Sequence, residues 1–303
     1  MTITPSLREL PENSSATKCL AYMRNTSSPL LCLDTADALT VKLLNQESSF
    51  IKGLWISSLG FSARRGVNDS YCLNPRDYLS TLFEINLVKE DQFIIVDGDN
   101  GGQSHKSSDH YAAVMAQAGA AIYIMENKRG AKYNSLDKAA GRLHMLEDRE
   151  VFASKINSAK RSQLLVAIRL EDAIAAEDAR QGLHDAIETT KYYMKHSRPD
   201  MFVLHWNSED PAVVLEFAKQ YHELFGREQN VPLLGCIPTR YSKNCRSQQL
   251  YAAGYKMIIY ANALLRAQVT GIQQTVELLK KDDSLASVDD IFSPIDDILT
   301  LMP

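Results

Sequence analysis

Two acidic side chains follow directly after the apolar run FIIV (93–96): Asp97 and Asp99, separated by one glycine. Residues two apart on an extended chain share a face, so both carboxylates can reach one point, where they repel unless a cation or a proton lies between them. Glu126 ends the next apolar run, AAIYIM (120–125), and brings a third acid. Such oxygen ligands suit Mg²⁺, which keeps several of its waters. Asp-Gly-Asp alone favours a simple turn with Asx capping; Glu126 shifts the prediction to a metal site.

Cationic side chains also follow apolar runs. Arg169 comes after LLVAI (164–168) and His205 after MFVL (201–204). A guanidinium fork beside a bound cation suits a phosphate or carboxylate ligand. The structural alternatives are an ion pair of Arg169 with Glu171 and a hydrogen-bonded rim histidine.

The segment ENKRGAKYNS (126–135) contains Lys128, Lys132 and Asn134 and shows no apolar periodicity. It is typical of a loop that covers a site and excludes water. A solvated loop is the alternative. Polar residues end most other runs as well, and together they predict one convergent site: Ser57, Ser58, Thr239, Arg240 and Asn262.

Eight short apolar runs must position these side chains. They are continuous, which favours strands buried on both faces of a parallel sheet, and segments with helical spacing separate them. This order predicts a (β/α)₈ TIM-type barrel, whose site lies after the strands. A doubly wound sheet is the alternative, but no GxGxxG follows the first run. The runs span 29–33, 52–57, 93–96, 120–125, 164–168, 201–204, 231–237 and 256–260.

Length and composition suit one domain of this kind. The chain has 303 residues, and a single barrel accommodates that length. Residues 1–25 are predicted to form a loose polar arm with about one helical turn, and residues 26–303 the barrel domain.

Charge and cysteine content limit which kinds of partner and cellular compartment are expected. The net charge is −4 and no basic run occurs, which argues against nucleic acid. No apolar stretch approaches the roughly 20 residues of a membrane span, and the N-terminus shows no secretory h-region. Five cysteines without a CxxC pair are typical of a reduced, intracellular chain. We therefore expect a cytoplasmic protein with a small-molecule partner.

Seven blocks of sequence resemble the phosphoenolpyruvate mutases, the phosphonate-forming branch of the isocitrate lyase superfamily. The resemblance runs in order from about Asp34 to the C-terminus. The blocks are WISSLGFSARRGVNDS (55–70), VDGDNGG (96–102), ENKRGAKYNSL (126–136), VAIRLEDAIA (166–175), VLHWNSEDP (203–211), CIPTRY (236–241) and YANALLRAQVTGIQQT (260–275).

The resemblance implies reversible, Mg²⁺-dependent conversion of phosphoenolpyruvate to 3-phosphonopyruvate. It also implies a barrel whose C-terminal helix is exchanged between subunits of a homodimer or homotetramer. Asp97 would bind Mg²⁺ directly, and Asp99 and Glu126 through its waters. The implied catalytic residues are Asp69, Lys132, Asn134, Arg169 and His205, and the implied substrate-binding residues are Trp55, Ser57, Ser58, Leu59 and Ser135.

The lid selects the branch. Isocitrate lyases carry a Cys and a His there, which this segment lacks, and Lys132-Tyr133-Asn134-Ser135 has the mutase form, where the hydrolases tend to have Thr-Ser. The alternatives are a hydrolase or lyase acting on phosphonopyruvate or another 2-oxo acid, and a catalytically silent relative with a regulatory role. Four retained polar residues favour an enzyme: Lys132, Asn134, Arg169 and His205.

The sequence departs from the family pattern in four places. Asn127 stands where the family usually has Asp, so one charge near the metal is missing, and Ser58 stands where it usually has Gly. Leu170-Glu171-Asp172 replaces a Val-Glu-Ala pattern. Asp99-Asn100-Gly101-Gly102-Gln103 replaces Asp-Thr-Gly-Tyr-Gly.

Overall fold

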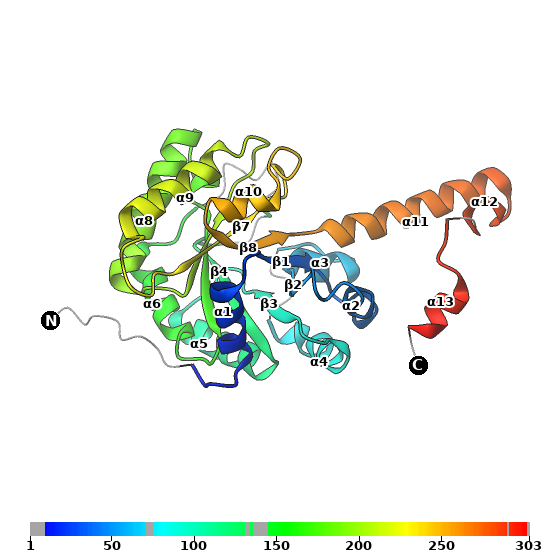
Figure 1. Cartoon of the computed structure of the whole chain (residues 1–303), viewed down its shortest axis with the longest axis horizontal. Coiled ribbons are helices and arrows are strands. Elements are labelled where there is room, and N and C mark those ends of the chain that lie inside the picture. The colour runs from blue at the N-terminus through cyan, green and yellow to red at the C-terminus, as the bar shows by residue number, and fades with distance from the viewer. Residues whose placement is uncertain (1–9, 71–74, 131–133, 136–144, 290, 302–303) are drawn as a thin grey trace.

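Eight parallel strands close into a barrel (Figure 1). The computed structural model describes residues 10–70, 75–130, 134–135, 145–289 and 291–301. Each strand pairs with its neighbours in sequence, and β8 closes the barrel against β1. The predicted TIM-type barrel is confirmed, and each predicted run overlaps one strand: β1 (Leu30–Asp34), β2 (Gly53–Ile56), β3 (Phe93–Asp97), β4 (Ala120–Glu126), β5 (Leu165–Leu170), β6 (Met201–His205), β7 (Leu233–Ile237) and β8 (Tyr255–Tyr260).

Helices cover the outside of the barrel, and polar side chains fix where several of them begin. Ser104 accepts a hydrogen bond from the N–H of Ser107 at the start of α5, and Asp178 accepts one from Gln181 at the start of α8. The helices are α1 (Ser15–Asn25), α2 (Ala38–Asn45), α3 (Ser58–Arg64), η1 (Pro75–Tyr78), α4 (Leu79–Val88), α5 (His105–Gln117), α6 (Arg149–Ala159), α7 (Asp172–Ala175), α8 (Ala179–His196), α9 (Ala212–Phe225), α10 (Ser247–Ala252), α11 (Ala263–Asp282), α12 (Ala286–Asp289) and α13 (Ile295–Thr300).

The hydrophobic core has two layers because each strand is buried on both faces. The outer layer lies between strands and helices and includes Val166 and Phe217. The inner layer fills the barrel with side chains such as Ile95, Val203 and Met257. This double burial explains why the strand sequences are continuously apolar.

Helix α1 closes the N-terminal end of the barrel. Ala16, Cys19 and Met23 are buried in the inner layer, and the ring of Tyr22 packs 5.9 Å from the ring of Phe93, the first residue of β3. The prediction of a loose arm with one helical turn is therefore wrong for residues 15–25, because every third or fourth residue of this polar segment is apolar. The domain boundary at residue 25 stays a prediction.

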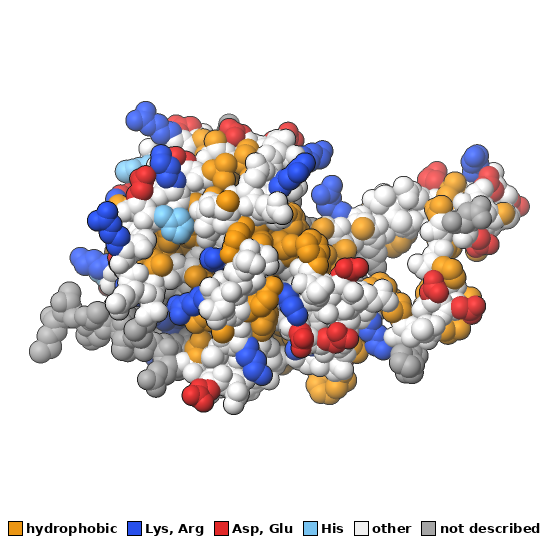
Figure 2. Space-filling view, viewed as in Figure 1, with side chains coloured by type: hydrophobic (Ala, Val, Ile, Leu, Met, Phe, Trp, Pro, Cys, Tyr) orange, Lys and Arg blue, Asp and Glu red, His pale blue; other side chains and the backbone are white. Residues whose placement is uncertain are grey.

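Helix α11 projects from the barrel (Figure 1). Asp34, at the end of β1, holds its first turn by accepting hydrogen bonds from the N–H groups of Leu264 and Leu265, at 2.8 and 2.9 Å. No residue of α11 is buried. Figure 2 shows hydrophobic side chains on the projecting segment, and those of α11 recur at helical spacing: Val269, Ile272, Val276 and Leu279.

No helix in the described part of the chain is long and apolar enough to cross a membrane. Cys19, Cys32, Cys236 and Cys245 are buried free thiols, and Cys72 lies outside the described residues.

Candidate active site

A polar pocket lies at the C-terminal ends of the strands. Its cavity volume is about 50 Å³. All the predicted site residues line it except Asp99 and Lys132, and Lys132 lies outside the described residues. The lining residues are Trp55, Ser57, Ser58, Leu59, Asp69, Asp97, Glu126, Asn134, Ser135, Arg169, His205, Ile237, Thr239, Ala261 and Asn262.

Asp97 and Asp99 do not share a face of one strand. Strand β3 ends at Asp97, and Asp99 has a left-handed backbone with φ 48°. The N–H of Asp99 donates to Oδ1 of Asp97 at 3.3 Å, an Asx-type turn. The extended-chain prediction is therefore wrong here, because the chain turns where the strand ends. Of these two residues, Asp97 lines the pocket and Asp99 does not. A role for Asp99 through water stays a prediction.

Glu126 is a buried carboxylate whose two oxygens differ in their contacts. Its Oε2 pairs with the guanidinium of Arg169 and lies 3.4 Å from Nζ of Lys128. Its Oε1 is buried and has no hydrogen-bond partner among the described residues. Burial of an oxygen that accepts no hydrogen bond costs free energy, and a bound hard cation would offset that cost.

The pocket fits Mg²⁺ held largely through water. Asp97 and Glu126 supply the oxygen donors that this ion prefers. Within the described ranges, no three acidic, histidine or cysteine side chains come close enough to hold one ion directly. Because Mg²⁺ commonly keeps several waters, two carboxylates at the pocket are compatible with it.

Glu171 is the hub of the site, although it does not line the pocket. It is fully buried after β5, and its Oε1 accepts from Nε of Arg169 at 2.5 Å and lies 3.1 Å from Nδ1 of His205. Its Oε2 accepts from Oγ of Ser135 at 3.0 Å and lies 3.8 Å from Nζ of Lys128. One carboxylate thus orients side chains from four segments.

The charges of this cluster stabilise one another. Burial alone would raise the pKa of Glu171, but Lys128, Arg169 and His205 outweigh it and hold that pKa well below its ordinary value. Burial likewise disfavours the charge of Arg169, yet Glu126 and Glu171 hold its pKa well above the usual range. The carboxylate and the guanidinium are therefore both ionised at neutral pH.

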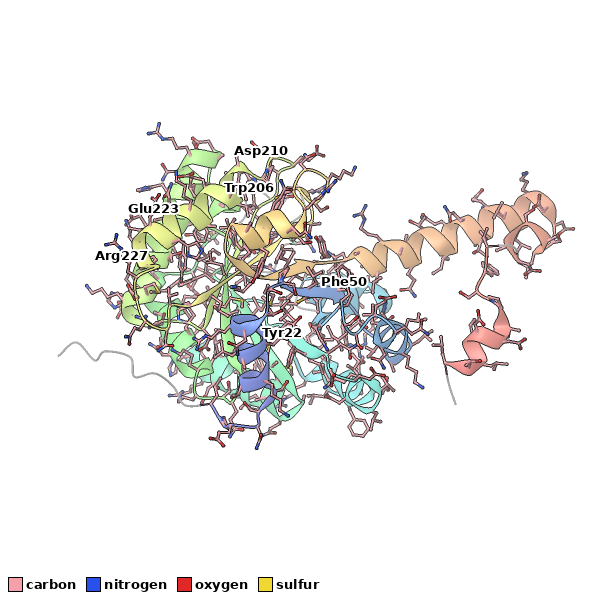
Figure 3. The ribbon with its side chains drawn as sticks, in the orientation of Figure 1. Tyr22, Phe50, Trp206, Asp210, Glu223 and Arg227 are labelled. Atoms are coloured by element: carbon pink, nitrogen blue, oxygen red, sulfur yellow. The ribbon has the colours of Figure 1, made fainter. Side chains whose placement is uncertain are left out.

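His205 presents a defined ring nitrogen to the pocket. An ionised Glu171 can only accept, so Nδ1 of His205 carries a proton and donates a hydrogen bond to Glu171, which leaves Nε2 as the other ring nitrogen. The neighbouring Trp206 takes no part, because its Nε1 donates to the carbonyl oxygen of Asp210 at 2.8 Å on the outer rim (Figure 3).

Asn134 and Ser135 are held against the barrel. Nδ2 of Asn134 donates to Oδ2 of Asp69 at 2.9 Å, and the carbonyl oxygen of Ser135 accepts from Nδ2 of Asn207 at 3.0 Å. The predicted cover does not begin at residue 126: Glu126 belongs to β4, and Asn127 and Lys128 are buried. That boundary was wrong because the polar side chains of 126–128 satisfy one another inside the fold.

Asn127 and Asp172 explain two of the departures from the family pattern. Nδ2 of Asn127 donates to Oδ2 of Asp172 at 2.8 Å, and Oδ1 of Asn127 accepts from the N–H of Glu171 at 2.9 Å. Asn127 therefore points beneath the pocket, away from Glu126. The carboxyl group that the sequence lacks at position 127 stands at position 172.

Two polar lining residues were noted from the sequence as strand-end residues but were given no individual role. Thr239 follows β7, and Asn262 follows β8 with φ 63° and lies 3.5 Å from Oγ of Ser57. Their position at strand ends was a usable signal. Glu171 was noted only as an ion-pair partner, and Lys128 only as one of several cations near an anion, because their central place depends on three-dimensional packing.

Comparisons with known proteins agree with this geometry. A family model described as phosphoenolpyruvate phosphomutase matches residues 20–280. The phosphoenolpyruvate phosphomutase of Tetrahymena pyriformis is 24% identical over 298 residues, which cover 98% of this chain and 94% of that protein.

Solved structures share the fold along nearly the whole chain. The phosphoenolpyruvate phosphomutase of Streptomyces platensis subsp. rosaceus superposes with a TM-score of 0.83 at 25% identity, covering 95% of this chain and 94% of the other. A phosphonopyruvate hydrolase in complex with oxalate and Mg²⁺ superposes with a TM-score of 0.79 at 21% identity and the same coverage. Because the family match extends from helix α1 through every strand of the barrel into α11, the chain belongs to the phosphoenolpyruvate phosphomutase family.

Proposed function

We propose that the protein is a Mg²⁺-dependent phosphoenolpyruvate phosphomutase that interconverts phosphoenolpyruvate and 3-phosphonopyruvate. In the forward direction the P–O bond to the enol oxygen breaks and a P–C bond to the methylene carbon forms, while the enol becomes a ketone. No proton is gained or lost. Phosphoryl transfer of this kind needs positioned charges and little covalent help from the protein. Family membership and the charged pocket support the proposal.

The observation that carries the proposal is the amide of Asn134 at the pocket, held by Asp69 at 2.9 Å. An amide can donate a hydrogen bond to a phosphoryl oxygen, but it can neither attack phosphorus nor take a proton from water. A phosphoryl group held this way is kept for return to the enolate rather than passed to a hydrolytic nucleophile.

The other residues divide between the two ends of the substrate. Arg169 offers a planar fork to the phosphoryl group, and His205 lies at the pocket, where it is proposed to help stabilise the enolate. Ser57, Ser58 and Leu59 bind the substrate carboxylate. Asp97 and Glu126 would hold Mg²⁺, which supplies positive charge against the developing enolate and phosphoryl charge. Lys132, which lies outside the described residues, is proposed to stabilise the enolate as well.

The small volume of the pocket supports water exclusion. The hollow of about 50 Å³ is narrow, and we propose that Asn134 and Ser135 shift as substrate binds. Closure over the bound substrate would then keep water from the phosphoryl group.

One assay distinguishes the alternatives. The protein is incubated with Mg²⁺ and phosphonopyruvate, and phosphorus is followed by NMR. A phosphoenolpyruvate signal supports the mutase. A signal of inorganic phosphate rejects the mutase in favour of a phosphonopyruvate hydrolase. An unchanged spectrum rejects both activities and leaves a lyase acting on another 2-oxo acid, or a catalytically silent relative.

Two substitutions test the assigned roles. Asp97→Ala is expected to abolish turnover and Asn134→Ala nearly to abolish it, with the fold retained by circular dichroism. Asn157→Ala is the matched control, because Nδ2 of Asn157 donates to the carbonyl of His196 at 3.2 Å on the exposed side of α6, away from the pocket. Full activity in either pocket variant would reject its role.

We further propose that α11 packs on a second subunit of a homo-oligomer. A helix of 20 residues with no buried side chain and an apolar face needs a partner surface. Ile272→Glu should reduce the molar mass measured by light scattering, whereas Gln274→Glu on the opposite face should not. A monomeric wild-type protein would refute the proposal.

A further inference from the structure

A buried chain of hydrogen bonds runs beneath the pocket, outside the residues that line it. Oγ1 of Thr189 on α8 donates to Oδ1 of Asp172 at 2.5 Å, and Nδ2 of Asn127 donates to Oδ2 of Asp172 at 2.8 Å. Oδ1 of Asn127 then accepts from the N–H of Glu171 at 2.9 Å. We propose that the Asp172–Asn127 pair is a positioning device, which sets the orientation of Glu171 and through it the polar side chains of the pocket.

Asp172 is not explained by packing. It is 1% exposed, and among the described residues it forms no ion pair. Burial raises its pKa, and the hydrogen bonds from Thr189 and Asn127 only partly offset that cost. An apolar side chain at this site would avoid the cost altogether. A carboxyl group at position 172 is therefore consistent with a role as the acceptor of the hydrogen bonds from Thr189 and Asn127.

The donors and acceptors allow only one arrangement of the Asn127 amide. The backbone N–H of Glu171 can only donate, so it requires the oxygen of Asn127, and the amide nitrogen must then face Asp172. Asn127 is also tied through its backbone, since its N–H donates to the carbonyl of Arg169 at 3.3 Å. The pair therefore locks the end of β4 to the end of β5.

Glu171 passes this constraint to the pocket. Its two carboxylate oxygens orient Arg169, His205 and Ser135, which all line the pocket. A tilt of the Glu171 backbone would move all three together. Misplacement of catalytic groups by about 1 Å can cost roughly 100-fold in rate.

An exchange of the two side chains tests the pair. In Asn127→Asp two acidic groups face each other, so the link to Glu171 is strained. In the double variant Asn127→Asp/Asp172→Asn an acid and an amide face each other again: the new carboxylate accepts from the N–H of Glu171 and from the amide at 172, whose oxygen accepts from Thr189. Thr189→Val is the isosteric probe of the far end of the chain.

The first readout is kinetic and depends on the proposed mutase activity. At saturating Mg²⁺, Asn127→Asp should lower kcat about 100-fold with KM little changed. The double variant should return to within about tenfold of wild type, as expected of residues in direct contact. Asp178→Asn is the matched control, because Asp178 caps α8 through the N–H of Gln181 and touches neither residue.

The second readout needs no activity. Long-range ¹H–¹⁵N NMR of histidine reports which ring nitrogen of His205 carries the proton, and His205→Gln assigns the signal. The free wild-type protein should show the proton on Nδ1, Asn127→Asp a mixture, and the double variant the wild-type form. If wild type fails to make phosphoenolpyruvate, the proposed function fails and this readout alone decides.

The outcomes are separable. Loss in Asn127→Asp and recovery in the double variant support the pair. Wild-type behaviour of Asn127→Asp, or equal loss in single and double variants that melt cooperatively, overturns it. If Asn127→Asp does not fold, Thr189→Val replaces it: a lowered kcat with a mixed His205 signal supports the pair, and wild-type values in both readouts overturn it.

Discussion

Glu171→Gln tests whether the buried charge of the hub holds the site together. Glu171 is 0% exposed and is paired with Arg169 at 2.5 Å and His205 at 3.1 Å. Removal of one partner from a buried ion pair typically costs about 3–5 kcal/mol, because the remaining charge stays buried. Arg169 and Lys128 keep Glu126 as a second partner, so we expect the lower end, about 3 kcal/mol.

The assay is thermal and urea unfolding of both proteins. For a chain of this size the midpoint should fall by about 6 °C. Glu188→Gln is the matched control: Glu188 pairs with Lys191 at 2.7 Å, but 40% of its side chain is exposed, and such pairs are worth about 1 kcal/mol or less.

The pH dependence of the difference is a second check. The pKa of Glu171 is lowered in the folded state, whereas in the unfolded chain it is about 4.3. The stabilisation is therefore fully present above that pH and is lost as the pH falls toward the folded-state value. The gap between wild type and Glu171→Gln should be constant near neutrality and narrow in acid. Equal stability at pH 7, or a gap that widens in acid, would refute the assigned role.

Three further predictions concern single features. Arg169→Lys should lower kcat about 100-fold or more, because an ammonium cannot replace the fork that spans Glu126 and Glu171; a loss confined to KM would contradict this. Gly98→Ala should destabilise the fold by about 1–3 kcal/mol in urea unfolding, since a Cβ would lie 2.3 Å from the Tyr123 ring, whereas Gly60→Ala has 3.6 Å of room and should not. Chelation of divalent ions should abolish both turnover and calorimetric binding of phosphonopyruvate, and readdition of Mg²⁺ should restore both.

The barrel was predictable because its strands carry their own signal. Burial on both faces makes each strand an uninterrupted apolar run, so KMIIY and FIIV mark β8 and β3 almost to the residue. Polar residues directly after such runs then fall at one end of the barrel by topology alone. This is why Asp97 and Arg169, far apart in sequence, could be assigned to one pocket.

What the sequence could not predict depends on contacts between distant segments. Helix α1 is polar overall. Its place against the barrel depends on Cys19 and Met23, which are buried in the inner layer of the core. Asp99 was placed on an extended chain, although the glycine before it permits a turn. Asn127 counted as a missing charge until Asp172 was found against it, because the two lie 45 residues apart.

The balance of charges at the pocket bears on the need for a divalent cation. Four carboxylates that line the pocket or pair with its cations face two cations in the described part of the chain: Asp69, Asp97, Glu126 and Glu171 against Lys128 and Arg169. A substrate that carries a phosphate and a carboxylate adds negative charge to a site already negative, and in a buried setting this repulsion is large. Because Glu171 is committed to Arg169 and His205, the carboxylates left to attract a cation are those at the pocket surface. Asp97 and the unbonded oxygen of Glu126 are therefore the groups through which a divalent ion would offset the excess negative charge of the site and help to admit the anion.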